Sequence, residues 1–190
     1  MRNVIFAINL TADGCCDHTK LTGFDDVHEY FTQLMQDADL LVYGRTTYEL
    51  MVPFWPHIAE NQSAPTKAIN EFAQIFTAID KVVFSRSLES VEDRRTRIVH
   101  THPGEEIRKL KQQEGKKILL GGVNLPSQLI ALNLVDEFRF VIQPIIAGEG
   151  RRLWEGTALT ARSGLKLVGS EVLESGCVAL QYLKQDKSPN

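Results

Sequence analysis

Hydrophobic and polar positions along the chain form two alternating patterns. Short apolar runs bounded by polar residues are typical of strands buried on both faces of a sheet. Between these runs, apolar residues recur at helical spacing, and within residues 25–37 they fall at i, i+3, i+4, i+7 and i+8. The runs predict strands at residues 4–10, 40–43, 81–84, 97–100 and 117–120, and the spacing predicts helices at 25–37, 44–51, 68–79, 105–114 and 125–134.

After residue 134 the pattern changes from helices to strands. A long strand pattern at 135–146 is broken by Pro144, and two runs at 165–173 and 177–183 flank a short turn, which predicts an antiparallel hairpin. The whole pattern predicts an α/β three-layer domain with a mostly parallel central sheet and an antiparallel C-terminal edge hairpin. We expect one domain over residues 1–184, a polar tail at 185–190 and a stiff aromatic loop at 52–57.

Composition narrows the classes of protein to consider. The chain has 190 residues with a net charge of -3 and no long basic run, so nucleic acid is not an expected partner. It has no apolar run long enough for a membrane span and no signal peptide pattern. Three cysteines form no disulfide framework, and the adjacent Cys15 and Cys16 lack the spacing of zinc ligands. We therefore expect a cytoplasmic protein without a metal.

Two glycine-containing corners carry the candidate chemistry. Each follows a predicted strand and opens a predicted helix, where close backbone approach and free N–H groups suit a phosphate. An alternative is that the glycines serve only packing and that a threonine caps the helix. The two corners are Gly44-Arg45-Thr46-Thr47 and Gly121-Gly122-Val123-Asn124.

Two further strand ends carry polar residues. Asp13-Gly14 follows the first strand and Ser85-Arg86 follows the third. In parallel sheets ligands bind beyond the carboxyl ends of strands, so these residues and the two corners are expected to converge on one cleft. The dinucleotide fingerprint G-x-G-x-x-G is absent, so a different arrangement is needed. Asp13 also fits an ordinary turn.

Taken in order, these segments resemble the dihydrofolate reductase-like family, in particular the branch of the C-terminal reductase domain of a bacterial riboflavin biosynthesis protein. The resemblance covers nearly the whole chain. It rests on Asp13-Gly14, on the segments at 43–49, 84–86 and 120–122, and on the segment at 144–153.

The resemblance implies a bound NADPH. Its phosphates would lie against Gly44, Arg45, Thr46 and Thr47, with Gly121, Gly122, Val123 and Asn124 holding the pyrophosphate from the other side. Ser85 and Arg86 would lie near the adenosine ribose and favour its 2′-phosphate, hence NADPH over NADH. The nicotinamide would lie against Ala7 and Ile8.

The resemblance also implies a substrate between the first strand and the helix at 25–37. The expected substrate contacts are Asp13, His28, Phe31, Phe54 and Trp55, and Asp13 is the candidate for proton relay. True dihydrofolate reductases carry a carboxylate on this helix, whereas alignment through Phe31 places Val27 there. Asp26 lies one residue away, about a quarter turn off, so the polar contact is expected from Asp13, His28 or Glu29 instead.

The implied function is an NADPH-dependent oxidoreductase that transfers hydride to a small heterocyclic or carbonyl substrate. Such an enzyme would be similar to the 5-amino-6-(5-phosphoribosylamino)uracil reductase of riboflavin biosynthesis. The alternatives are a dihydrofolate or pterin reductase, a non-catalytic nucleotide-binding protein, and a structural dimer module. A homodimer is expected, with no interface located.

Overall fold

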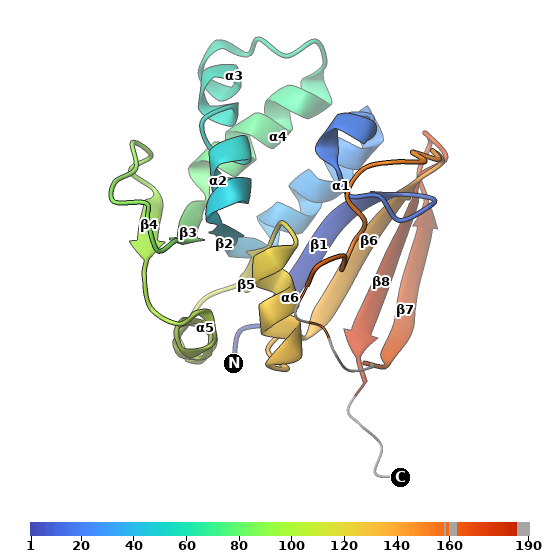
Figure 1. The fold of residues 1–190 in the computed structure, drawn as a ribbon. Coiled ribbons are helices and arrows are strands. Elements are labelled where there is room, and N and C mark those ends of the chain that lie inside the picture. The colour runs from blue at the N-terminus through green and yellow to red at the C-terminus, as the bar shows by residue number, and fades with distance from the viewer. Residues whose placement is uncertain (158, 160–162, 186–190) are drawn as a thin grey trace.

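A single mixed sheet runs through the molecule and separates two layers of helices (Figure 1). The computed structural model describes residues 1–157, 159 and 163–185. Within these residues the sheet has eight strands in the order β4-β3-β2-β5-β1-β6-β8-β7. The first six strands in this order are parallel, and β8 pairs antiparallel with both β6 and β7. The mostly parallel sheet with an antiparallel C-terminal hairpin is therefore confirmed. The strands are β1 (Val4–Thr11), β2 (Ala38–Gly44), β3 (Asp80–Phe84), β4 (Thr96–Val99), β5 (Lys117–Leu120), β6 (Glu137–Gln143), β7 (Leu165–Val172) and β8 (Val178–Lys184).

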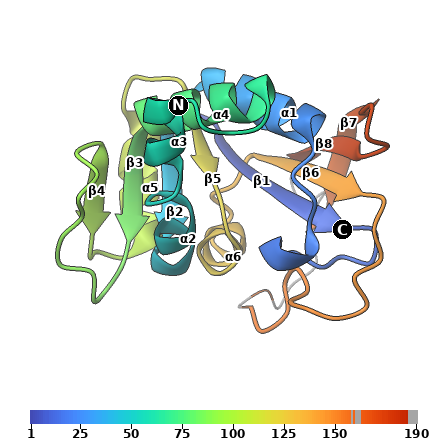
Figure 2. The ribbon, with the colours of Figure 1, turned by 90° about the horizontal axis from the view of Figure 1, so that it is seen from above.

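The helices lie on both faces of the sheet, as the view from above shows (Figure 2). One layer contains α1 (Asp25–Gln36) and α4 (Lys67–Ala78), and the short α2 (Arg45–Met51) and α3 (Trp55–Asn61) contribute to the same core cluster. The other contains α5 (Pro103–Gln112) and α6 (Asn124–Ala131). A 3-10 helix, η1 (His18–Lys20), lies between β1 and α1. Among the described residues, no helix is long and apolar enough to cross a membrane.

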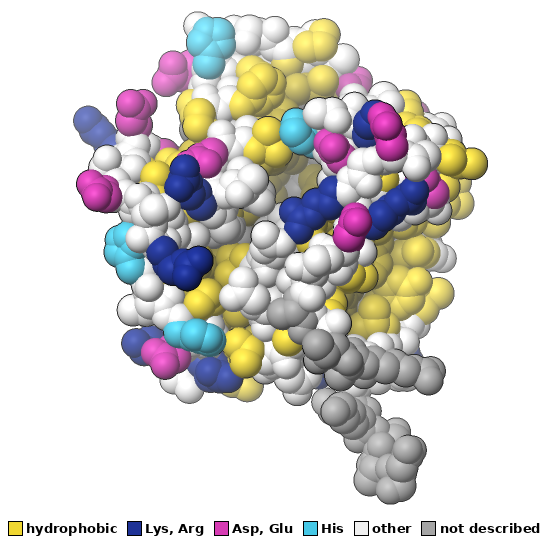
Figure 3. Space-filling view, in the orientation of Figure 1, with side chains coloured by type: hydrophobic (Ala, Val, Ile, Leu, Met, Phe, Trp, Pro, Cys, Tyr) yellow, Lys and Arg dark blue, Asp and Glu magenta, His cyan; other side chains and the backbone are white. Residues whose placement is uncertain are grey.

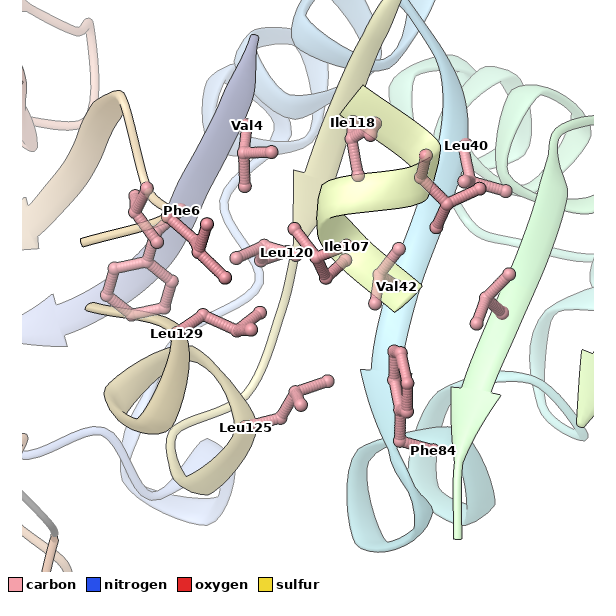
Figure 4. Close-up of a cluster of buried hydrophobic side chains, with 14 of the residues drawn as sticks. Val4, Phe6, Leu40, Val42, Phe84, Ile107, Ile118, Leu120, Leu125 and Leu129 are labelled. Carbon is pink, nitrogen blue, oxygen red and sulfur yellow. The ribbon is translucent and has the colours of Figure 1, made fainter. Parts of the chain in front are cut away.

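The central strand β1 is buried on both faces, which explains its continuous apolar run. Phe6 packs into the cluster under α5 and α6, whereas Ile5 packs under α1 and α4, and neither side chain is exposed. Figure 4 shows the first cluster, in which Leu125 and Leu129 of α6 point toward the strands. The helix at 25–37 forms as predicted because its apolar stripe packs on this sheet.

Two local predictions were wrong, and one short helix was missed. The expected loop at 52–57 contains the start of α3, whose Pro56 sits in the first turn, where a missing N–H costs no hydrogen bond. Strand β6 ends at Gln143, because Pro144 cannot continue the ladder, and does not reach residue 146. The 3-10 helix η1 was not predicted. Residues 186–190 of the expected tail lie outside the described residues.

Candidate functional site

A cavity of about 980 Å³ opens where the parallel strands β1, β2, β3, β4 and β5 end. Figure 3 shows this face from outside, with a hollow bordered by Lys and Arg side chains. All the cofactor residues expected from the sequence except Ala7 line this cavity. They are Ile8, Gly44, Arg45, Thr46, Thr47, Ser85, Arg86, Gly121, Gly122, Val123 and Asn124. Ala7 is 8% exposed and packs in the core under α1 and α4.

At the β2–α2 corner, Gly44 ends the strand and no side chain caps the helix. The guanidinium of Arg45 is held in place from two sides. Its Nε donates to Glu49 Oε1 at 2.6 Å, one helical turn along, and its Nη1 donates to Ser87 Oγ at 2.7 Å. Because no side chain caps α2, the alternative explanation of this corner, a threonine that caps the helix, is wrong. Arg45 is oriented at the cavity wall but about half exposed.

At the β5–α6 corner, the two glycines are required by packing. A Cβ on Gly121 would collide with the ring of Tyr43, and one on Gly122 would collide with the hydroxyl of Thr47. Gly122 also has a φ of +83°, a conformation that L side chains rarely adopt. The two corners therefore interlock, and the packing explanation of the glycines holds together with their place in the cavity.

The third strand end brings a hydroxyl and a cation to the same wall. Ser85 Oγ accepts from the backbone N–H of Leu88 at 2.9 Å, so it shapes the turn that follows β3. Arg86 has no hydrogen-bond or ion-pair partner among the described residues. His100 Nδ1 donates to the Ser85 carbonyl at 2.7 Å, which leaves Nε2 available. His102 also lines this part of the cavity.

Part of the cavity wall was missed by the sequence analysis. Residues in the turn and 3-10 helix after β1 line it, and Arg151 reaches it from the segment after β6. Their position next to strand ends was the signal in the sequence that could have assigned them to the cavity. They were missed because loop residues show no hydrophobic periodicity. The missed lining residues include Asn9, Cys16, Asp17, His18, Leu21, His100, Thr101, His102, Gln128 and Arg151.

Asp13, the candidate proton relay, is not among the cavity-lining residues. Its carboxylate accepts from Thr11 Oγ1 at 2.5 Å, Ala147 N at 3.1 Å and Gly148 N at 3.0 Å, and it pairs with Arg152 at 2.9 Å. These donors, with the Thr11 hydroxyl first, hold the pKa of Asp13 well below its usual range. The side chain therefore joins two loops, and its geometry argues against a proton donor.

The four other expected substrate residues also lie outside the cavity lining. His28 Nδ1 donates to the Phe24 carbonyl at 2.9 Å, and its ring contacts those of Trp55 and Phe72 edge-on. Trp55 is 8% exposed, with no acceptor for its Nε1 among the described residues. Phe31 lies on α1 and is partly buried, whereas Phe54 is 57% exposed. These aromatic residues form part of the α1–α3–α4 layer.

Among the described residues, no three His, Cys, Asp or Glu side chains gather as metal ligands. Cys15, Cys16 and Cys177 are free thiols. Burial raises the pKa of Cys16, which lines the cavity, and that of Cys177. Neither thiol is therefore set up as a nucleophile.

Two curated relatives cover most of the chain. The uncharacterized protein YyaP of Bacillus subtilis (strain 168) is 33% identical over 153 residues, which are 80% of this chain and 77% of that protein. The uncharacterized protein YwjB of the same strain is 25% identical over 157 residues, 81% of this chain and 78% of that protein.

Solved structures share the fold at lower identity. A putative riboflavin biosynthesis protein from Shewanella sp. PV-4 aligns with a TM-score of 0.72 at 20% identity, covering 98% of this chain and all of that one (100%). A deaminase/5-amino-6-(5-phosphoribosylamino)uracil reductase from Thermotoga maritima aligns with a TM-score of 0.67 at 15% identity, over 97% of this chain and 57% of that one. The model of the RibD C-terminal domain matches residues 2–179, so the chain belongs to the RibD C-terminal domain family.

Proposed function

We propose that this protein is an NADPH-dependent reductase. The observation that carries the proposal is that one and the same cavity, at the carboxyl ends of the parallel strands, is lined by both glycine corners and by the Ser85-Arg86 turn. Membership of a reductase-type family supports it. When bound, NADPH supplies the hydride, and the chain's part is to bind, orient and exclude water.

The charge of the cavity suits an anionic dinucleotide. Three arginines, Arg45, Arg86 and Arg151, line it, against one carboxylate, that of Asp17. Guanidinium groups bind phosphates through paired, charge-assisted hydrogen bonds. The donor set of the cavity therefore fits the phosphates of the cofactor.

Preference for NADPH over NADH would come from the wall at the end of β3. Arg86 has no partner among the described residues there, and His100 and His102 lie on the same wall. A cation and two imidazoles suit an additional phosphate on the adenosine ribose. The nicotinamide would then lie toward the end of β1, near Ile8 and Asn9, and the buried Ala7 would contribute little.

A proton source other than Asp13 lies at this end of the cavity. His18 lines the cavity, and its Nδ1 is 3.8 Å from Asp17 Oδ1. Imidazole is the usual side chain for proton transfer near neutral pH. We therefore prefer His18, next to Asp17, as the group that donates a proton to the reduced substrate.

The substrate class is a small heterocycle or carbonyl compound, with an aminouracil of the riboflavin pathway type as the first candidate. A pterin is disfavoured by the position of the α1 carboxylate. Asp26 Oδ2 accepts from the Ser175 backbone N–H at 2.6 Å, in the turn between β7 and β8, and Val27 packs against Cys177 and Val141. A carboxylate tied to that turn is not free to bind a pterin.

Titration with NADPH and NADH tests the proposal directly, with nicotinamide fluorescence and melting temperature as readouts. A ligand at about 100 times its Kd should raise the melting temperature by about 5–10 °C. Arg45→Ala should weaken binding, whereas Arg108→Ala, on the exposed side of α5, should not. Oxidation of bound NADPH would then be screened with aminouracils, pterins and small carbonyls. If the wild-type protein binds neither nucleotide, the reductase proposal fails; binding without any turnover would favour a nucleotide-binding protein.

A further inference from the structure

Arg151 differs from the neighbouring cations in having no carboxylate partner. Lys20 pairs with Glu149 at 2.5 Å, and Arg152 pairs with Asp13 at 2.9 Å. Arg151 belongs to the same pair of loops but forms no ion pair with any described residue. Its positive charge is therefore uncompensated where it lines the cavity.

The guanidinium of Arg151 lies at the β5–α6 corner. Its Nη2 donates to Asn124 Oδ1 at 2.5 Å, and Asn124 is the first residue of α6. The backbone N–H groups of Gly122 and Val123, just before it, have no acceptor among the described residues. Unused donors from two distant parts of the chain thus meet at one place on the cavity wall.

The backbone below this side chain is fixed, while the side chain itself is exposed. The Arg151 carbonyl accepts from Cys16 N at 2.8 Å, and Leu153 N donates to the Gly14 carbonyl at 3.0 Å. A guanidinium has five N–H donors in a planar fork that matches phosphate oxygens, and a single neutral amide oxygen uses only one of them. Asn124 is therefore a weak partner that an anion can replace.

We propose that Arg151 is a nucleotide-binding residue and that its guanidinium binds the diphosphate of NADPH, exchanging the amide of Asn124 for phosphate oxygens. The inference rests on the proposed function, because it places NADPH in the cavity. It assigns the segment between β6 and β7 to the binding site. The diphosphate would then be bound both by Arg151 of this segment and by the two glycine corners.

The test measures Kd for NADPH and for NADH with the wild type, Arg151→Ala, Arg151→Lys, Arg86→Ala and Arg108→Ala. Both nucleotides carry the diphosphate, so Arg151→Ala should weaken both by about ten- to a hundredfold and leave their ratio unchanged. Arg151→Lys should lie between wild type and Arg151→Ala, because it keeps the charge without the fork. Arg86→Ala should weaken NADPH selectively, and Arg108→Ala should change neither.

Two other outcomes for the Kd values of Arg151→Ala would contradict the inference. If the wild type binds NADPH and Arg151→Ala binds both nucleotides equally well, the inference is wrong and the proposed function stands. Selective loss of NADPH in Arg151→Ala would place Arg151 at the 2′-phosphate and also overturn it. Melting curves identify a misfolded variant. If Arg151→Ala is misfolded, Arg151→Lys decides, and an affinity for both nucleotides equal to that of the wild type would overturn the inference.

Discussion

Asp13 shows how a polar residue at a strand end can be structural. Its carboxylate joins the turn after β1 to the backbone of Ala147 and Gly148 and to Arg152. Because its pKa in the folded protein lies below that of the unfolded chain, the carboxylate stabilises the fold above about pH 4. This contribution is lost as the pH falls through that value toward the folded pKa.

Asp13→Asn should therefore lower the melting temperature at neutral pH, and the difference from wild type should shrink as the pH falls below about 4. Melting curves from about pH 3 to pH 7 measure both effects. Glu114→Gln, at an exposed carboxylate just beyond the end of α5, serves as the control and should leave the melting temperature at neutral pH close to that of wild type. A difference that stayed constant over this range would show that the ionised form of Asp13 is not what stabilises the loops.

The proton source makes a second prediction at this scale. His18→Gln should leave NADPH affinity within about twofold of wild type but slow turnover of an accepted substrate by about a hundredfold or more, because proton transfer by a placed side chain is worth that much. Equal turnover rates for wild type and His18→Gln would reject the assignment, and Asp13→Asn would then need the same measurement.

Among the elements, the two corners depend on each other. Gly122→Ala would introduce strain at a positive φ and a collision with Thr47, and should destabilise the protein by about 1–3 kcal/mol and weaken NADPH binding. Gly148→Ala is the matched control, since its φ is +72° but nothing lies within 4 Å of the added Cβ. Denaturant unfolding should show a larger loss for Gly122→Ala than for Gly148→Ala.

A double-mutant cycle separates the collision from the strain. Thr47→Ala removes the hydroxyl that the new Cβ would meet, so the double variant Gly122→Ala/Thr47→Ala should recover part of the lost stability. Strict additivity of the two single changes would mean that the corners do not interlock in this way.

The elements were predictable to the extent that their periodicity was set by burial. Strands β1, β2, β3 and β5 and helices α1 and α4 each bury an apolar run or stripe, which the sequence alone makes visible. The start of α3 at Trp55 and the turn of η1 have no such period. Loop residues such as His18 and Arg151 take their positions from contacts between segments far apart in the chain, and those contacts leave no local pattern.

At the scale of the whole molecule, no helix among the described residues covers the sheet beyond α6, on the face where Tyr182 lies. Figure 1 shows β6, β8 and β7 with no helix in front of them, and Figure 3 shows apolar side chains over this region. Leu167 lies opposite Tyr182 and is 51% exposed, and Val172 lies opposite Val178 and is 74% exposed. Directly opposite residues of antiparallel strands share a face, so these side chains form one apolar surface.

We propose that a second copy of the chain covers this surface, because a sheet face can pack on its own two-fold copy. The double variant Leu167→Lys/Val172→Lys should shift the mass in solution from dimer to monomer, measured by light scattering after gel filtration. Lys166→Glu, on the opposite face of β7, should leave the mass unchanged. A monomeric wild type, or a dimer that survives the double substitution, would contradict this interface.

The sequence by itself determined the α/β architecture, the strand ends that line the cavity and the family to which the chain belongs. These properties follow from apolar periodicity and from short segments in a fixed order. Only the tertiary structure decided that Asp13 joins two loops, that the aromatic residues around Trp55 pack within a helical layer, and that Arg151 reaches α6. Those outcomes depend on which donors and acceptors meet once distant segments are packed, and the position of a residue in the chain does not specify its partners.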